Sequence, residues 1–134
     1  MTRLRDWPER LDAFLRERAA VPFAWGSNDC CTFVADAIDA MTGRDVMADL
    51  RGRYSNAFGA LGLTQELGGL QAAVTGLLGE PCHPALVTVG DVLLVRTEDR
   101  ELLLLCNGAT AIGPGLRGIE TLAAPDVVCA WRVE

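Results

Sequence analysis

The sequence contains no lysine and only one histidine, His83, among its 134 residues. All twelve basic residues are therefore arginines, and against 18 acidic residues they leave a net charge of −6. This acidic balance, with no basic cluster, argues against nucleic-acid binding as the main task. It also disfavours binding to an anionic membrane surface.

Long apolar runs are missing as well. No stretch approaches the ~20 residues of a membrane span, and the N-terminus lacks the apolar region of a signal peptide. Half of the residues are nonetheless hydrophobic, which is too many for a disordered chain. No repeat or linker interrupts the sequence, so it predicts one domain over residues 1–134 without membrane insertion.

The five cysteines show no disulfide pattern, because their number is odd and two of them are adjacent; they are Cys30, Cys31, Cys82, Cys106 and Cys129. The simplest interpretation is reduced thiols in a cytosolic environment. No pair among the cysteines and His83 has the two-to-four-residue separation typical of zinc ligands. The sequence therefore predicts neither a metal nor a cofactor.

Apolar residues recur at helical spacing in three early segments, which predicts helices over residues 6–20, from Cys30 to just before Gly43, and over 64–78. Asp6 and Glu9 resemble a capping box at the first of these, and Thr64 is a candidate cap of the third. Gly68 and Gly69 lie inside the third helix, where glycine either allows close packing or marks a bend.

Short apolar runs follow from residue 85 onward and predict strands over 86–89, 92–96, 102–106 and 127–133. Residues 97–100 and 107–108 are expected to form turns, and residues 113–118 a loop. Helices first and an antiparallel sheet second predict an α+β fold, with N-terminal helices packed on a C-terminal sheet.

The segment from Phe23 to Ala37 predicts a loop that turns directly into a helix. Gly26 permits an unusual turn, and the three residues before Cys30 can all cap a helix. Cys30 then lies in the first turn, where free N–H groups and the helix dipole favour a thiolate. The alternative is a buried, inert cysteine, because Cys30 also lies on the apolar stripe of its helix.

This segment, read as WGSNDCCTFVADA, resembles the nucleophile segment of the NlpC-type papain-like cysteine peptidases, which cleave cell-wall peptides. The resemblance places Asp29 before a nucleophile at Cys30. A second match is Gly90-Asp91 followed by residues 92–95, which resembles the strand that opens the small β-sheet of that family. The resemblance implies the NlpC-type papain-like fold.

The resemblance does not extend to the catalytic base. The family's catalytic histidine position falls on Arg100 or Glu101, and only Thr110 is available near the third polar position. Arginine can stabilise a thiolate by its charge but cannot carry a proton at neutral pH. His83 precedes the Gly-Asp turn, so it is either a base brought to Cys30 by a loop or an exposed loop residue.

Four further residues are candidates for binding. Trp25 either forms a wall of the site or packs in the core. In the resembled family an Arg-containing loop lies beside the cleft, and here the loop carries Arg51, Arg53 and Tyr54. The alternative is a surface loop that Tyr54 anchors. The Trp-Gly-x-x-Asp-Cys segment and this loop also resemble a group of small phage-tail proteins.

Two functions follow as alternatives. In the first, the chain is a non-catalytic NlpC-like structural component of a bacteriophage tail tip, assembled in the host cytoplasm, with other tail proteins as partners. In the second, it is a cysteine peptidase or amidase that contacts and cleaves peptidoglycan, with Cys30 as nucleophile and His83 or a partner's group as base. A small bacterial binding module of the same fold is a third.

Overall fold

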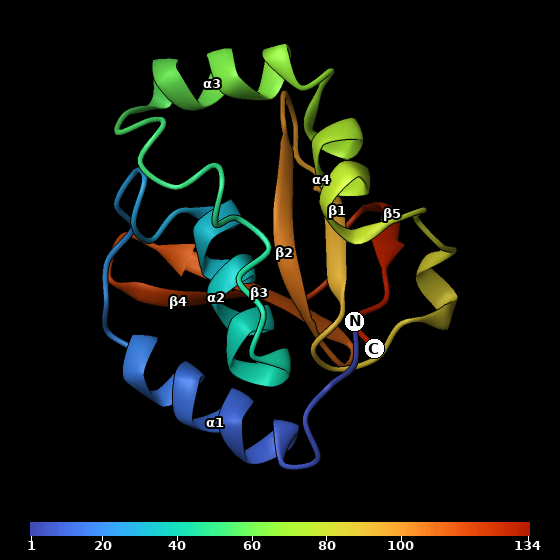
Figure 1. Ribbon diagram of the computed structural model, residues 1–134. Helices are drawn as coiled ribbons and strands as arrows, with labels where there is room; N and C mark the ends of the chain where they lie inside the picture. The colour runs from blue at the N-terminus through green and yellow to red at the C-terminus, as the bar shows by residue number, and fades with distance from the viewer.

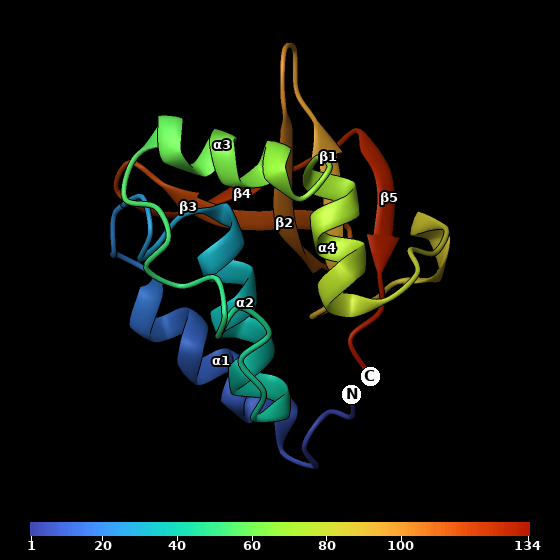
Figure 2. The ribbon, with the colours of Figure 1, turned by 45° about the horizontal axis from the view of Figure 1, so that its top comes forward.

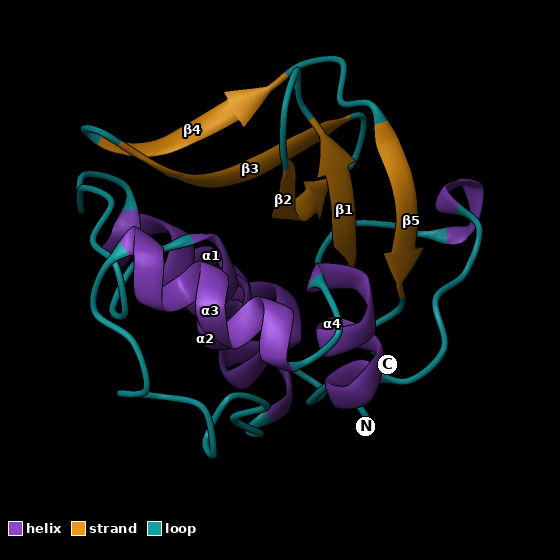
Figure 3. Ribbon diagram, turned by 90° about the horizontal axis from the view of Figure 1, so that it is seen from above, coloured by secondary structure: helices purple, strands orange, loops and turns teal.

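The computed structural model describes residues 1–134 and has helices packed on one side of an antiparallel sheet (Figures 1 and 3). The elements in chain order are α1 Trp7–Arg18, α2 Cys30–Thr42, α3 Ala57–Glu66, α4 Leu70–Leu78, the short 3₁₀ helix η1 Pro84–Leu86, β1 Val92–Arg96, β2 Glu101–Asn107, β3 Thr110–Gly115, β4 Gly118–Leu122 and β5 Val127–Trp131. The sheet order is β4-β3-β2-β1-β5. This arrangement confirms the α+β prediction. None of the helices combines the length and apolar character that crossing a bilayer requires.

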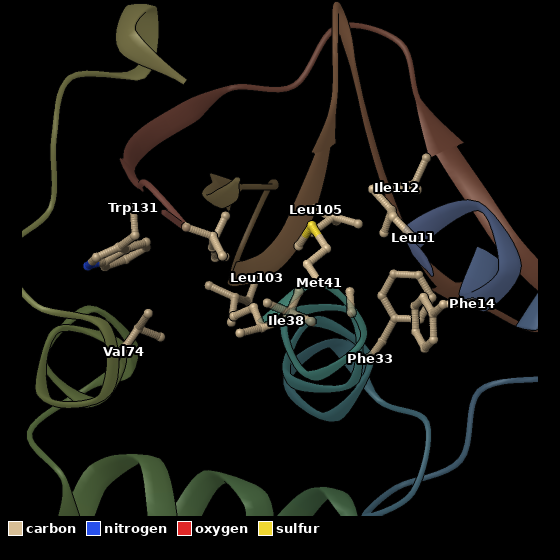
Figure 4. Packing of buried hydrophobic residues seen from close by; sticks show 14 of the residues in the cluster. Leu11, Phe14, Phe33, Ile38, Met41, Val74, Leu103, Leu105, Ile112 and Trp131 are labelled. Carbon is tan, nitrogen blue, oxygen red and sulfur yellow. The ribbon is translucent and has the colours of Figure 1, made fainter. Parts of the chain in front are cut away.

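The main core lies between the sheet and the central helix α2. Alternate residues of each strand face the helices, as the period of two along a strand requires, and Leu103 and Leu105 of β2 belong to this face. Phe33 of α2 is fully buried and contacts Phe14 of α1, with 5.3 Å between their ring centroids. Figure 4 shows these two rings at one end of the core and Val74 of α4 beside Trp131 at the other.

A smaller apolar cluster occupies the opposite face of the sheet, where Leu104 and Cys106 of β2 point. The segment before β1 covers part of this face. Cys82 forms a β-bridge with Ala130 of β5, with 2.7 Å between its amide nitrogen and the Ala130 oxygen. The chain around His83 therefore lies beside the edge strand β5.

Asp91 of the Gly-Asp motif is buried and ties the two ends of the chain together. Its carboxylate accepts hydrogen bonds from the guanidinium of Arg3 at 2.8 Å, the amide of Val133 at 2.8 Å and the amide of Thr88 at 2.9 Å. The termini accordingly lie close together in Figures 1 and 2. The motif is thus a structural clamp at the start of β1.

The helix predictions are confirmed for α1 and α2, and Gly43 ends α2 in a left-handed conformation with φ +78°. Asp6 does not cap α1, because its carboxylate accepts from Arg10 instead. The single helix predicted over 64–78 is wrong. Gly68 and Gly69 adopt φ of +92° and +106°, and they separate α3 from α4. Asn56, not Thr64, caps α3.

Three strand predictions are confirmed with small shifts, those that became β1, β2 and β5, and so are the turns at residues 97–100 and 107–108. The predicted strand over 86–89 is wrong, since η1 occupies its start. The predicted loop over 113–118 is wrong as well, because its ends belong to β3 and β4. Pro114 is tolerated in β3 because the pairing of β3 with β2 ends at Ile112. Beyond that residue β3 has only β4 as a neighbour, so its other edge is unpaired.

Candidate functional site

Asp29 closes the loop before α2 and directs its carboxylate to four donors. One oxygen accepts from the amides of Cys31 and Thr32, both at 3.0 Å, and the Thr32 hydroxyl accepts from the Asp29 amide at 2.8 Å. The other oxygen accepts from the Gly26 amide at 2.8 Å and from the Tyr54 hydroxyl at 2.7 Å. This is a capping box with two additional bonds, so the buried carboxylate is saturated and serves the fold.

Gly26 makes this loop possible. Its φ is +85°, and a Cβ atom there would lie 2.7 Å from the carbonyl oxygen of Tyr54. The loop and the Tyr54 segment thus approach each other closely, and together they fix the position at which α2 begins.

Cys30 is the first residue of α2 and lies partly exposed in a cavity. Its sulfur is 3.9 Å from that of Cys31. The pKa of Cys30 is lowered from its ordinary value, first because Cys31 donates a hydrogen bond to the thiolate and then through a backbone hydrogen bond from Leu103 and the positive charge of Arg100. Burial and the charge of Asp29 oppose this shift. The pKa of Cys31 is raised, so the pair releases one proton readily and the second reluctantly.

The strand facing Cys30 is the first half of β2. β3 pairs with β2 only from Leu105 to Asn107, so the earlier part of β2 has no neighbour on that side. The backbone of Leu103 is therefore free to reach the Cys30 sulfur. Arg100 and Glu101 lead into this strand, and both line the same cavity as Cys30.

The structure does not bring His83 to Cys30. The imidazole is exposed at the start of η1, and its Nδ1 accepts from the amide of Ala85 at 3.0 Å. The segment carrying it pairs with β5, which is separated from β2 by β1 in the sheet. His83 is not among the residues that line the cavity.

Of the candidate binding residues, Trp25, Tyr54 and Arg100 line the cavity with Cys30, whereas Arg51 and Arg53 do not. Trp25 is 39% exposed and stacks edge-on against Phe23, so it is not a core residue. Burial and then the bond to Asp29 raise the pKa of Tyr54, which keeps its hydroxyl protonated.

Arg51 and Arg53 are used in ion pairs elsewhere. Arg51 bridges Asp36 of α2 at 2.5 Å and Asp45 at 2.8 Å, and Asp36 also accepts from Arg18 at 2.6 Å. Arg53 pairs with Glu66 at 3.3 Å. The Arg51–Asp36 bond holds the loop after α2 against that helix, and the Arg53–Glu66 bond joins the loop to α3.

The cavity has a volume of about 450 Å³, and 22 of its 28 lining residues are hydrophobic. It lies between α2, the loop that follows it, α3, α4 and the start of β2. The polar residues that it contains are few, and the ionisable ones are Asp29, Cys30, Cys31, Tyr54, Arg100 and Glu101.

Sequence reasoning missed two features of the site. No role in the site was assigned to Cys31, yet its sulfur lies 3.9 Å from that of Cys30, and this contact is the first cause of the lowered pKa of Cys30. The apolar cavity was not expected, because its walls come from segments far apart in the chain. Residues 57–63 of α3 are apolar on all sides and are the one sequence signal for it, since such a segment is expected to pack against something.

Comparison with known proteins places the chain in a family. The profile of a family described as "Domain of unknown function (DUF6950)" matches residues 2–133, so the chain belongs to that family. No curated protein sequence matches the chain. Among solved structures, the crystal structure of the NlpC/p60 domain of peptidoglycan hydrolase SagA is similar, with a TM-score of 0.53 and 17% identity. The match covers 92% of this chain and 97% of that one. The predicted NlpC-type papain-like fold is thereby confirmed.

Proposed function

We propose that this member of the DUF6950 family is a non-hydrolytic NlpC-like module that serves as a structural component of a bacteriophage tail or tail tip. The proposal that the module is non-hydrolytic rests on two side chains at the start of β2. Arg100 and Glu101 share the cavity with Cys30, and the chain's one imidazole lies beside β5.

The chemistry of amide cleavage explains why this pair matters. Attack by a thiolate must be followed by protonation of the departing amine, which a positioned general acid normally supplies. The guanidinium of Arg100 holds its proton too tightly to release it, and an ionised Glu101 has no proton to give. Asp29 cannot substitute, because its carboxylate already accepts from four donors.

The assignment to a phage tail rests on the similarity of the Trp25-to-Cys30 segment and the Arg51-to-Tyr54 loop to small tail proteins. An exposed apolar helix fits such a role. Phe58 and Leu61 of α3 are 87% and 56% exposed, and exposed apolar patches commonly mark protein–protein contacts. We expect other tail proteins to bind there, without nucleic acid.

The test has two parts. Purified protein is incubated with peptidoglycan sacculi and soluble muropeptides beside an active NlpC/p60 hydrolase, and the products are followed by mass spectrometry. We expect no product that disappears in Cys30→Ala. In parallel, co-purification with the tail proteins encoded beside it should give a stoichiometric complex that Phe58→Asp weakens.

One observation favours a second function, a thiol-dependent peptidoglycan peptidase completed by a partner. Cys30 is partly exposed and has a lowered pKa, so it is available as a nucleophile. In that case cleavage appears only in the assembled complex and is lost in Cys30→Ala. Such cleavage would replace the structural assignment with this one.

A further inference from the structure

The cavity beside Cys30 has a volume of about 450 Å³ and a mostly hydrophobic lining. We propose that it binds one long-chain carboxylate of the fatty-acid class, with the alkyl chain between α2, α3 and α4 and the carboxylate at Arg100. This inference goes beyond the proposed function, and neither depends on the other.

The walls of the cavity suit an alkyl chain. Its volume of about 450 Å³ lies within the usual range for small-molecule sites, and hydrophobic side chains dominate the lining. A peptide in the same place would lose hydrogen bonds from its amides to water without finding partners, which is costly. An alkyl chain needs no such partners, and its burial is favourable in proportion to its area.

The helices over the cavity are loosely packed. α3 and α4 each contain only one buried residue, Leu63 and Val74, although both helices are strongly apolar. Figure 4 shows Val74 of α4 and Ile38 of α2 on opposite sides of the region below Leu103, and all three residues line the cavity. Gly68 and Gly69 join the two helices in conformations that only glycine adopts easily.

The charge that would meet the head group is supplied by Arg100. It is the sole basic residue lining the cavity, and its guanidinium forms no ion pair within the chain. The two acidic residues at the cavity have partners of their own. Asp29 is saturated by its loop, and Glu101 lies 3.7 Å from Arg96. A planar guanidinium without a partner matches a carboxylate, which it can bind through two parallel hydrogen bonds.

Direct binding tests the proposal. Purified full-length protein is titrated with cis-parinaric acid, a fatty acid whose fluorescence rises in an apolar site, and the probe is then displaced with palmitic acid or with hexadecanol. We expect one saturable site that palmitic acid occupies at least about tenfold more tightly than the alcohol, which is the lower end of the range for one charge-assisted hydrogen bond. Arg100→Gln should abolish this preference, whereas Arg117→Gln, in the exposed β3–β4 turn, should retain it.

A second pair of variants locates the alkyl chain. Ala73→Phe places a ring in the cavity from α4 and should weaken binding of the probe at least tenfold. Ala72→Phe adds the same ring on the exposed side of that helix and should have no effect. Should Ala73→Phe fail to fold, Ala60→Phe introduces the ring from α3 instead.

Protection of Cys30 gives an independent measurement. Bound palmitic acid should slow alkylation of Cys30 by iodoacetamide several-fold while leaving Cys129 unchanged. Equal binding of acid and alcohol, or undiminished binding in the cavity-filling variants, would overturn the proposal. Preferential displacement by a lysophospholipid of the same chain length would likewise overturn the assignment to a free carboxylate.

Discussion

The two walls of the cavity are built in opposite ways. On the α2 side, Asp29 accepts four hydrogen bonds, Gly26 contacts the backbone of Tyr54, and seven residues of the helix are buried. On the α3–α4 side, each helix buries one residue and Phe58 points into solvent at 87% exposure. The comparison teaches that the fold fixes the cysteine firmly and leaves the facing wall adaptable.

The largest effect expected from this difference concerns two phenylalanines. Phe33→Ala should lower the free energy of unfolding by about 4 kcal/mol, because the fully buried ring leaves a cavity against Phe14. Phe58→Ala should change it by less than about 0.5 kcal/mol, since the ring is exposed. Urea unfolding measures both. Similar losses for the two variants would show that α3 is part of the core.

The two helix caps provide the next comparison. Asp29→Ala removes the acceptor of four bonds and should cost about 3 kcal/mol of unfolding free energy. Asn56→Ala removes a single bond to the amide of Gly59 at 2.8 Å and should cost about 1 kcal/mol. Urea unfolding of the two variants measures both losses. An Asp29 variant as stable as the Asn56 variant would refute the rigid-wall description.

A smaller effect is expected at the bond between the rigid wall and its loop. Tyr54→Phe should cost about 1 kcal/mol by removing the hydroxyl that donates to Asp29. Burial and this bond raise the pKa of Tyr54, so its contribution is complete below the ordinary value of 10.0 and declines as the pH rises above it. The wild type should therefore lose more stability than Tyr54→Phe between pH 9 and pH 11. Parallel losses would mean that the phenol is free in solution.

The smallest effect concerns the thiol pair. Cys31→Ala removes the first cause of the lowered pKa of Cys30 and should move the pH profile of Cys30 alkylation upward. Thr42→Ala, at the far end of the same helix, is the control and should leave the profile in place. If Cys31→Ala moves it downward or not at all, the backbone of Leu103 and the charge of Arg100 set the pKa instead.

Local signals allowed much of the first wall to be predicted from the sequence. The cap-forming residues before Cys30, the apolar spacing after it and Gly43 fixed α2 almost to the residue. The resemblance put the family's histidine position on Arg100 or Glu101, and both residues line the cavity with Cys30.

The second wall was predicted poorly, for physical reasons. A continuous apolar stripe over 64–78 suggested one helix, while the preference of Gly68 and Gly69 for positive φ broke it into two. The β3–β4 hairpin was missed because Pro114 argues against a strand, unless the strand has an unpaired edge at that point. Whether an edge is paired depends on the arrangement of the whole sheet and cannot be read from the local sequence. For Arg51 and Arg53 the sequence left a place at the cleft and a surface loop as alternatives. Partners from distant segments, such as Asp36 and Glu66, hold them outside the cavity lining.

The most direct test of the central claim is the pH profile of Cys30 alkylation in the wild type and in His83→Ala. A thiolate with no imidazole opposite it should give a single inflection, below the ordinary thiol value of 9.0, at the same pH in both proteins. A reactive plateau extending to acidic pH in the wild type and lost in His83→Ala would contradict the account, because it would place a proton carrier against the sulfur.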